Sequence, residues 1–224
     1  MLKPKLEIAC FNASSALIAQ QGGADRVELC DDISSGGITP FFDTITEVRK
    51  NINIDLYIMI RPRGGDFIYS DEEFEEMKME MLLIKQKQVN GFVFGILNED
   101  GSIDRERNKE LVELAYPLPC TFHRAFDEVN DPAKALEDLI DCGFKTILTS
   151  GQKPNAVEGL NNLSKLIQLA EDRIIIMPGG GVRSSIIEKL KKLNTSFYHS
   201  SAIMGKSTHA NIDEVKLLKT KLND

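Results

Sequence analysis

The sequence predicts an α/β fold of the TIM-barrel class, a closed (β/α)8 barrel in a single domain over residues 1–224. Apolar runs of strand length alternate with helical segments eight times, and 224 residues divided by eight give 28 residues per unit. Polar side chains gather where nearly every run meets the following loop. A triglycine loop after the seventh run precedes serines after the eighth, and these two loops form the usual phosphate site of such barrels. An open doubly wound sheet is the alternative.

Caps and turn residues delimit the elements in the first half of the chain. Asn12 is a predicted N-cap, and Gly22 ends the helix that it starts. Thr39 is expected to cap the second helix, with Pro40 in its first turn. Ser70 to Glu73 form a predicted capping box for the third helix. The strands expected here are residues 6–10, 26–30, 55–60 and 91–97, and the helices 12–21, 39–50 and 70–88.

The second half of the chain carries the same kinds of cap and turn signals. Asp131-Pro132 predicts a helix start, and Gly143 predicts its end. Asn98 to Gly101 is a turn signal. The expected strands are residues 120–125, 146–151, 173–177 and 196–202, and the expected helices are 104–115, 131–142, 155–170, one from 184, and 212–222. The connection 203–211 carries no clear pattern.

Composition limits the classes of partner. A chain of 224 residues, 42% of them hydrophobic, can bury roughly 70–75% of the surface that its unfolded form exposes. The formal net charge of −7 disfavours nonspecific binding to nucleic acid or to an anionic membrane. No run approaches the roughly 18 apolar residues of a membrane span, and the first residues lack a signal-peptide core. We expect a soluble, cytoplasmic protein.

The fifth expected strand carries the densest group of functional side chains. Alternation over 120–125 would place Thr121 and His123 on one strand face and Arg124 on the other. Asp127 lies just beyond, where it could orient the imidazole. The alternative is that His123 is a satisfied core histidine and that Arg124 and Asp127 form a structural ion pair.

Two glutamates occupy apolar strands. Glu7 and Glu28 need partners, because an unpaired buried charge is costly. Arg26 could form an internal salt bridge with them, or both carboxylates could belong to a functional site. Arg61 and Arg63, close to two glycines, form a plausible anion clamp, since guanidinium groups bind carboxylate or phosphate in bidentate fashion. Alternatively, these arginines pair with nearby carboxylates.

These groups support an enzyme hypothesis, in which the barrel mouth acts on a small anionic or phosphorylated metabolite. A carboxylate crowded by another in a partly apolar site can have a pKa near neutrality, as acid–base chemistry requires. The expected class is lyase, isomerase or hydrolase. The candidate catalytic residues are Glu7, Glu28, Arg61, His123 and Asp127. The candidate anion-binding residues are Arg63, Gly179, Gly180, Gly181, Ser200 and Ser201. Whether His199 points into the barrel stays open, because one residue of register reverses the answer.

The four cysteines, Cys10, Cys30, Cys120 and Cys142, show no CxxC pair and no compact zinc pattern. In a chain of this size with no export signal, they are expected to be free thiols.

Several long motifs resemble the CutC family, described as copper homeostasis proteins. The matching stretches are RVELC at 26–30, GGITP at 36–40, RPRGGDF at 61–67 with Tyr69, TFHRAFD at 121–127, LTSGQ at 148–152, GGGV at 179–182 and HSSA at 199–202. The resemblance implies a TIM-type barrel, a cytoplasmic location, a homo-oligomer (dimer or tetramer) and a link to copper.

Members of this family with a proposed cuprous site carry a cysteine two residues after the first-strand glutamate and another in Glu-Leu-Cys. Here the first position is Ala9, and Cys10 beside it faces the other way; Cys30 matches the second position. Cuprous ion prefers thiolate and thioether ligands and accepts imidazole. The resemblance therefore implies copper binding at Cys30, with Cys10 or His123. A third hypothesis, a noncatalytic scaffold, is disfavoured by the ionisable residues at the strand ends.

Overall fold

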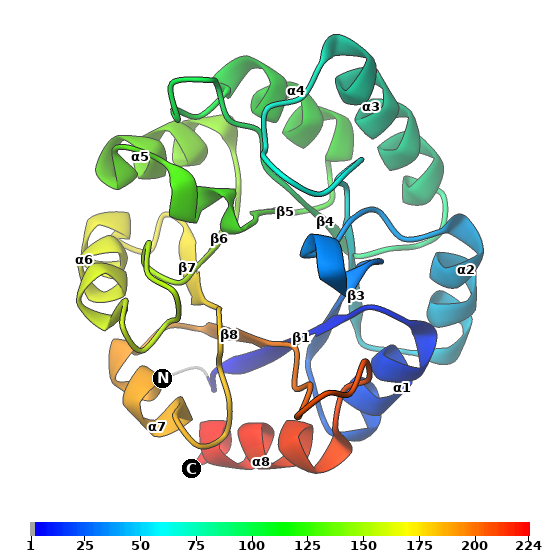
Figure 1. Cartoon of the computed structure of the whole chain (residues 1–224), viewed down its shortest axis with the longest axis vertical. Coiled ribbons are helices and arrows are strands. Elements are labelled where there is room, and N and C mark those ends of the chain that lie inside the picture. Colours follow the sequence, from blue (N-terminus) through cyan, green and yellow to red (C-terminus); the bar gives the residue numbers. More distant parts are fainter. Residues whose placement is uncertain (1–2) are drawn as a thin grey trace.

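A computed structural model of the chain describes residues 3–224, which form a nearly closed barrel of eight parallel strands (Figure 1). The strands are β1 (Lys5–Cys10), β2 (Arg26–Leu29), β3 (Asp55–Met59), β4 (Gly91–Phe94), β5 (Cys120–Phe122), β6 (Thr146–Thr149), β7 (Ile175–Pro178) and β8 (Phe197–Ser200). Each strand from β1 to β6 pairs with the next in sequence, and β8 pairs with β1, so β7 and β8 are the two end strands of the sheet. The end strands β7 and β8 lie next to each other, and the Thr195 hydroxyl, just before β8, donates to the Ile176 carbonyl of β7 at 2.6 Å. The expected barrel is confirmed.

Helices form the outer ring in Figure 1. They are α1 (Ala13–Gln21), α2 (Phe42–Asn51), α3 (Asp71–Lys85), α4 (Arg105–Ala115), α5 (Pro132–Cys142), α6 (Leu160–Ala170), α7 (Ile187–Leu190) and α8 (Ile212–Asn223). Short 3-10 helices are η1 (Ile33–Ser35), η2 (Arg124–Glu128) and η3 (Lys191–Leu193). Among residues 3–224, no helix is long and apolar enough to span a membrane.

The core has two compartments, because successive side chains of a strand point to opposite faces. The larger apolar cluster lies between the strands and the helices. Inside the barrel are two smaller clusters, one with Cys30, Tyr57, Met59 and Val93 and one with Leu148, Met177 and Phe197. Strand register also places Glu7 of β1 level with Arg26 of β2 and with His199 of β8. This register builds a polar layer across the barrel interior.

Several predicted boundaries are wrong, and for β5 and α2 the contacts show why. Strand β5 ends at Phe122 rather than Ala125, because the chain turns into η2 with the His123 side chain as its cap. Helix α2 begins at Phe42 without a side-chain cap. The Thr39 hydroxyl, expected to cap it, instead accepts from the Arg61 backbone N–H and donates to Glu80. Helix α6 begins at Leu160 rather than Asn155, and α7 has only four residues.

Candidate functional site

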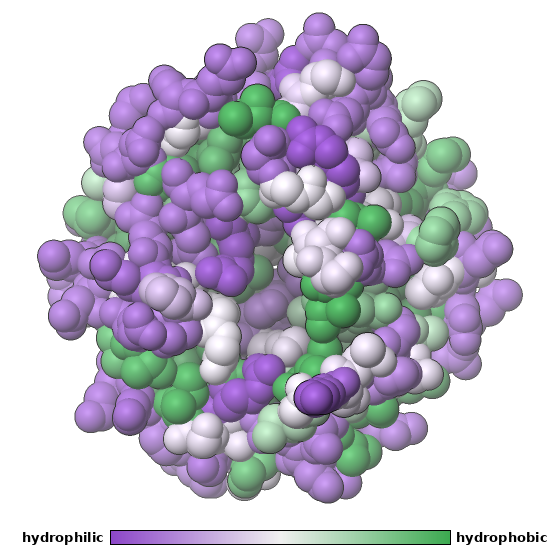
Figure 2. Space-filling model, viewed as in Figure 1, coloured by the Kyte–Doolittle hydropathy of each residue, from purple (hydrophilic) through white to green (hydrophobic). Residues whose placement is uncertain are grey.

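A cavity of about 210 Å³ opens at the carboxyl ends of the strands, and Figure 2 shows this hollow at the centre of the face. It is smaller than the roughly 300–1,000 Å³ of sites that hold drug-sized ligands. Its ionisable and hydroxyl-bearing lining residues are Glu28, Arg61, His123, Arg124, Arg183, His199, Ser200 and Ser201. The cavity therefore suits a small, polar ligand.

A buried chain of charges supports this cavity from below. Glu7 is fully buried, and its carboxylate accepts from Arg26 Nη1 at 2.8 Å and lies 2.7 Å from His199 Nδ1. The Arg26 guanidinium lies 4.0 Å from the ring centroids of both Tyr57 and Phe197. Burial alone would raise the pKa of Glu7, but the Arg26 charge and the His199 contact outweigh burial and lower it. The salt bridge between Glu7 and Arg26, one of the two alternatives for these carboxylates, is present, and Glu7 in turn orients His199.

Glu28 and His199 face each other across a short gap. His199 Nε2 lies 3.9 Å from Glu28 Oε2, and Glu28 Oε1 is buried with no hydrogen-bond partner within residues 3–224. Burial raises the pKa of Glu28 to about 7. Burial lowers the pKa of His199, but the Glu28 and Glu7 carboxylates outweigh it and raise that pKa. A proton can therefore reside on either side of the gap near neutral pH.

His123 is held as a neutral ring at the cavity wall. Its Nδ1 accepts from the backbone N–H of Ala125 at 3.3 Å, and its ring centroid lies 4.7 Å from that of Phe67. Its Nε2 has no partner in the described part of the chain. Burial, followed by the positive charge of Arg61, lowers the pKa of His123 to about 3.

Arg61 is buried and braces the loops around the cavity. Its Nη1 donates to the carbonyls of Ser35 and Gly37 at 2.9 and 3.0 Å, and its Nη2 donates to that of Gly65 at 2.7 Å. The guanidinium lies 4.7 Å from the Phe67 ring centroid. Its Nε atom is buried without a partner among the described residues.

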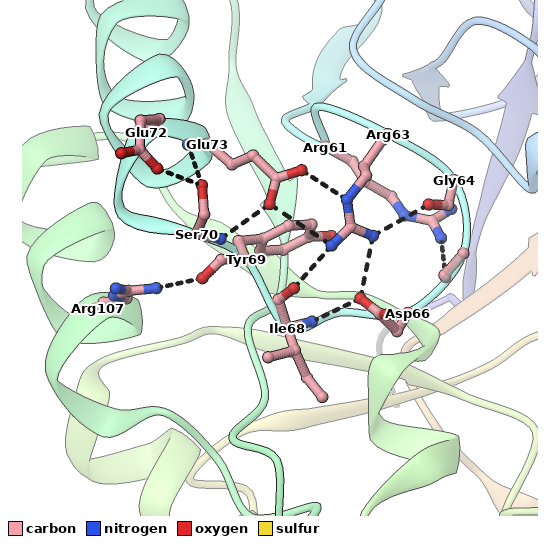
Figure 3. A network of polar contacts seen from close by, with 11 residues as sticks. Arg61, Arg63, Gly64, Asp66, Ile68, Tyr69, Ser70, Glu72, Glu73 and Arg107 are labelled. Atoms are coloured by element: carbon pink, nitrogen blue, oxygen red, sulfur yellow. Dashed lines mark hydrogen bonds and ion pairs between the residues drawn. The ribbon is translucent and has the colours of Figure 1, made fainter.

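Arg63, the other arginine of the predicted clamp, has a different environment (Figure 3). Its Nε donates to Glu73 at 2.6 Å, and its Nη atoms donate to Asp66 and to the Ile68 carbonyl. It is not among the residues that line the cavity. The structure therefore places Arg63 in a surface network that holds the loop onto the start of α3, and only Arg61 faces the candidate site.

Asp127 organises the next loop instead of contacting His123. Its carboxylate accepts from the Thr149 hydroxyl at 2.5 Å and from the Ser150 backbone N–H at 3.0 Å. It also accepts from Arg124 Nε at 2.8 Å. Because Arg124 lines the cavity, Asp127 positions a cavity arginine.

The last two loops form the rim that was expected to hold phosphate. Gly180 and Gly181 line the cavity with positive φ angles of 86° and 71°, a conformation that glycine adopts without strain. Gly179 is packed, since a Cβ there would lie 2.4 Å from Leu148. Ser201 also lines the cavity, and Ser200 is buried with its hydroxyl on the Val182 carbonyl.

Arg183 was missed by sequence reasoning, although it lies immediately after the glycine loop. Its guanidinium donates to the hydroxyls of Ser200 and Ser201, at 3.2 Å each, and to the Ile203 carbonyl at 2.9 Å. It therefore joins both terminal loops at the cavity edge. Its position two residues after three consecutive glycines is a sequence signal that could have identified it.

The cysteines occupy separate environments. All four thiols are free and buried. Cys30 belongs to a cluster inside the barrel, and its Sγ lies 3.5 Å from Glu28 Oε2. Cys10 packs between the strands and helices and donates to the Ile8 carbonyl. Burial and the Glu28 charge raise the pKa of both thiols.

Comparisons with known proteins agree with these motifs. The CutC family model matches residues 4–204. The human copper homeostasis protein cutC homolog is 46% identical over 198 residues, which cover 88% of this chain and 72% of that protein. A CutC family protein of Photorhabdus laumondii is 47% identical, with 88% of this chain and 79% of that protein covered.

Solved structures share the fold. A copper homeostasis protein CutC from Streptococcus agalactiae superposes with a TM-score of 0.84 and 30% identity, covering 88% of this chain and 98% of that one. A thiamine phosphate pyrophosphorylase from Pyrococcus furiosus has a TM-score of 0.67 at 14% identity, covering 98% and 96%. The second likeness extends to the fold alone.

Proposed function

The chain belongs to the CutC family of copper homeostasis proteins, and from this premise we propose that its barrel mouth binds a small anionic, phosphorylated metabolite and moves a proton on it. One observation carries the proposal. Glu28 lines the same cavity as Arg61, Arg124 and Arg183; its Oε2 lies 3.9 Å from His199 Nε2, and its Oε1 is buried with no hydrogen-bond partner among residues 3–224.

The three arginines support an anionic ligand. The chain as a whole carries a net charge of −7. Three arginines around one small cavity give this region a local positive charge. Guanidinium groups bind phosphate through charge-assisted, bidentate hydrogen bonds. Gly180 and Gly181 leave room for the backbone to approach such a group. The phosphate is therefore expected beside Arg183 and the glycine loop.

Glu28 and His199 support proton transfer. A general acid or base works best with a pKa near the operating pH, and the pKa of Glu28 is about 7. His199 is fixed by its contact with Glu7 at 2.7 Å, so its Nε2 stays directed toward Glu28. Such a pair suits a lyase, isomerase or hydrolase.

We expect Arg183→Met to weaken binding of inorganic phosphate by about tenfold or more, because a charge-assisted hydrogen bond contributes about 1.5–3 kcal/mol. Calorimetric titration of the folded proteins measures this. The matched control is Arg63→Met, which removes an arginine outside the cavity and is expected to change affinity less than about twofold. Equal losses in the two variants would refute the proposed site.

A second candidate function is cuprous ion binding, which the copper homeostasis relatives suggest. One observation favours it: Cys30 shares an interior cluster with Met59, and thiolate with thioether fits a soft cuprous ion. Cys10 lies on the other side of the barrel wall. His123 could bind the ion only through Nε2, because its Nδ1 already accepts from the Ala125 N–H. Nε2 would first have to lose its proton. A site of this kind would centre on Cys30.

Anaerobic titration of the reduced protein with cuprous ion against a competing chelator tests this candidate. We expect Cys30→Ser to abolish stoichiometric binding and Cys10→Ser to leave it unchanged, because only the Cys30 thiol faces the barrel interior. If Cys30→Ser binds cuprous ion as the wild type does, Cys30 is not part of a copper site.

A cytoplasmic location and a homo-oligomer, dimer or tetramer, complete the proposal. Four free cysteines are typical of a protein kept in a reducing compartment. The exposed Phe41, Leu83 and Tyr116 side chains offer apolar area for contact with a second copy.

A further inference from the structure

Three buried polar atoms on cavity residues lack partners within residues 3–224: His123 Nε2, Arg61 Nε and Glu28 Oε1. Buried polar groups are almost always hydrogen-bonded, and exceptions in a native protein indicate a ligand, a water or a catalytic role. Two of these atoms belong to donors and one to an acceptor. A ligand that satisfies them needs an oxygen acceptor near His123 and an acidic proton near Glu28.

The hydrogen bond at Nδ1 determines the chemistry of His123. The Ala125 backbone N–H can only donate, so Nδ1 must present its lone pair. In the neutral ring the proton is therefore on Nε2, the unpartnered nitrogen. The ring cannot easily rotate, because Phe67 lies against it and a Cβ at Gly95 would be only 2.8 Å from Nδ1. His123 is a fixed, neutral hydrogen-bond donor.

Resting on the proposed function, we propose that the ligand is a small phosphorylated aldehyde or ketone, and that His123 Nε2–H stabilises the oxyanion formed when Glu28 removes a proton from the carbon beside the carbonyl. The C–H bond breaks, and its electron pair forms a C=C bond. The carbonyl π electrons move onto oxygen, and the proton passes to the Glu28 carboxylate. His123 keeps its own proton throughout.

The environment matches this division of roles. A donor that is already aimed at the position of developing charge needs no reorganisation when the charge appears. Because Nδ1 accepts from the Ala125 N–H, the ring is neutral and His123 serves as an electrophile while a separate carboxylate serves as base, a pairing known in another barrel enzyme. His199, fixed by Glu7, lies 3.9 Å from Glu28 and can accept or return the proton.

The test uses phosphoglycolohydroxamate, a planar mimic of the enediolate, with inorganic phosphate as the reference probe. Nitrogen-15 NMR of the histidines at pH 7 is expected to show His123 protonated on Nε2, with that proton shifted downfield when the hydroxamate binds. His123→Gln, checked for folding by its thermal melt, is expected to weaken the hydroxamate at least tenfold and inorganic phosphate less than twofold.

A proton on Nδ1, equal losses for both probes, or wild-type protein that binds the hydroxamate no more tightly than phosphate would each overturn the inference. Failure of the proposed function looks different: neither probe would bind the wild-type protein, or Arg183→Met would not weaken phosphate. The NMR tautomer is read without any ligand, so it tests the His123 assignment in either case.

Discussion

Glu28→Gln is expected to slow proton transfer by about 10²–10⁴-fold, the usual contribution of a positioned general base. Glutamine keeps the size of the side chain but cannot take up a proton. The measurement is exchange of solvent deuterium into dihydroxyacetone phosphate, a small phosphorylated ketone used here as the probe, followed by proton NMR. Binding of inorganic phosphate serves as the control and should persist. Exchange at the wild-type rate would contradict the assignment of Glu28 as the base.

The same variant should alter the pH dependence of stability. The folded-state pKa of Glu28 is raised from 4.5 to about 7, so the native state holds a proton that the unfolded state has released. This contribution is fully present below pH 4.5 and is lost as the pH rises through about 7. It amounts to about 3 kcal/mol at 1.36 kcal/mol per pKa unit. Urea unfolding across that range should show a shallower decline for Glu28→Gln than for wild type.

Arg26→Met is expected to lower the free energy of unfolding by about 3–5 kcal/mol, because it leaves the buried Glu7 carboxylate without its cation. Urea unfolding measures this loss. The matched control is Arg173→Met, which breaks an exposed two-bond pair with Glu137 and should cost no more than about 1 kcal/mol. Similar losses in both variants would mean that the charge layer across the barrel does not support the fold as described.

Local signals predicted local structure well. The N-cap at Asn12, the capping box from Ser70 to Glu73 and the helix start at Asp131-Pro132 are confirmed. These signals depend on hydrogen bonds between residues close in sequence, since a capping side chain accepts from backbone N–H groups of the next turn. Thr39 failed as a cap because its hydroxyl is used by Arg61 and Glu80, partners that no local pattern reveals.

The site shows the same limit. Glu7 and Arg26 could be paired from neighbouring strands, but the contact of Glu7 with His199 spans 192 residues. Whether His199 points inward depends on the register between β1 and β8, which is set only when the barrel closes. Likewise, an arginine's role depends on the partners it meets. Arg63 is held by Glu73 outside the cavity, while Arg183 reaches the serines of the last loop.

The central claim is that the barrel mouth binds a small phosphorylated anion, and a crystal structure with phosphoglycolohydroxamate tests it most directly. We predict the phosphate within hydrogen-bond distance of Arg183 and the Gly180–Gly181 backbone, with the hydroxamate oxygen on His123 Nε2 and the opposite edge toward Glu28. A hydroxamate bound outside the cavity, or an empty mouth in crystals soaked at a hydroxamate concentration far above that of the protein, would contradict the account.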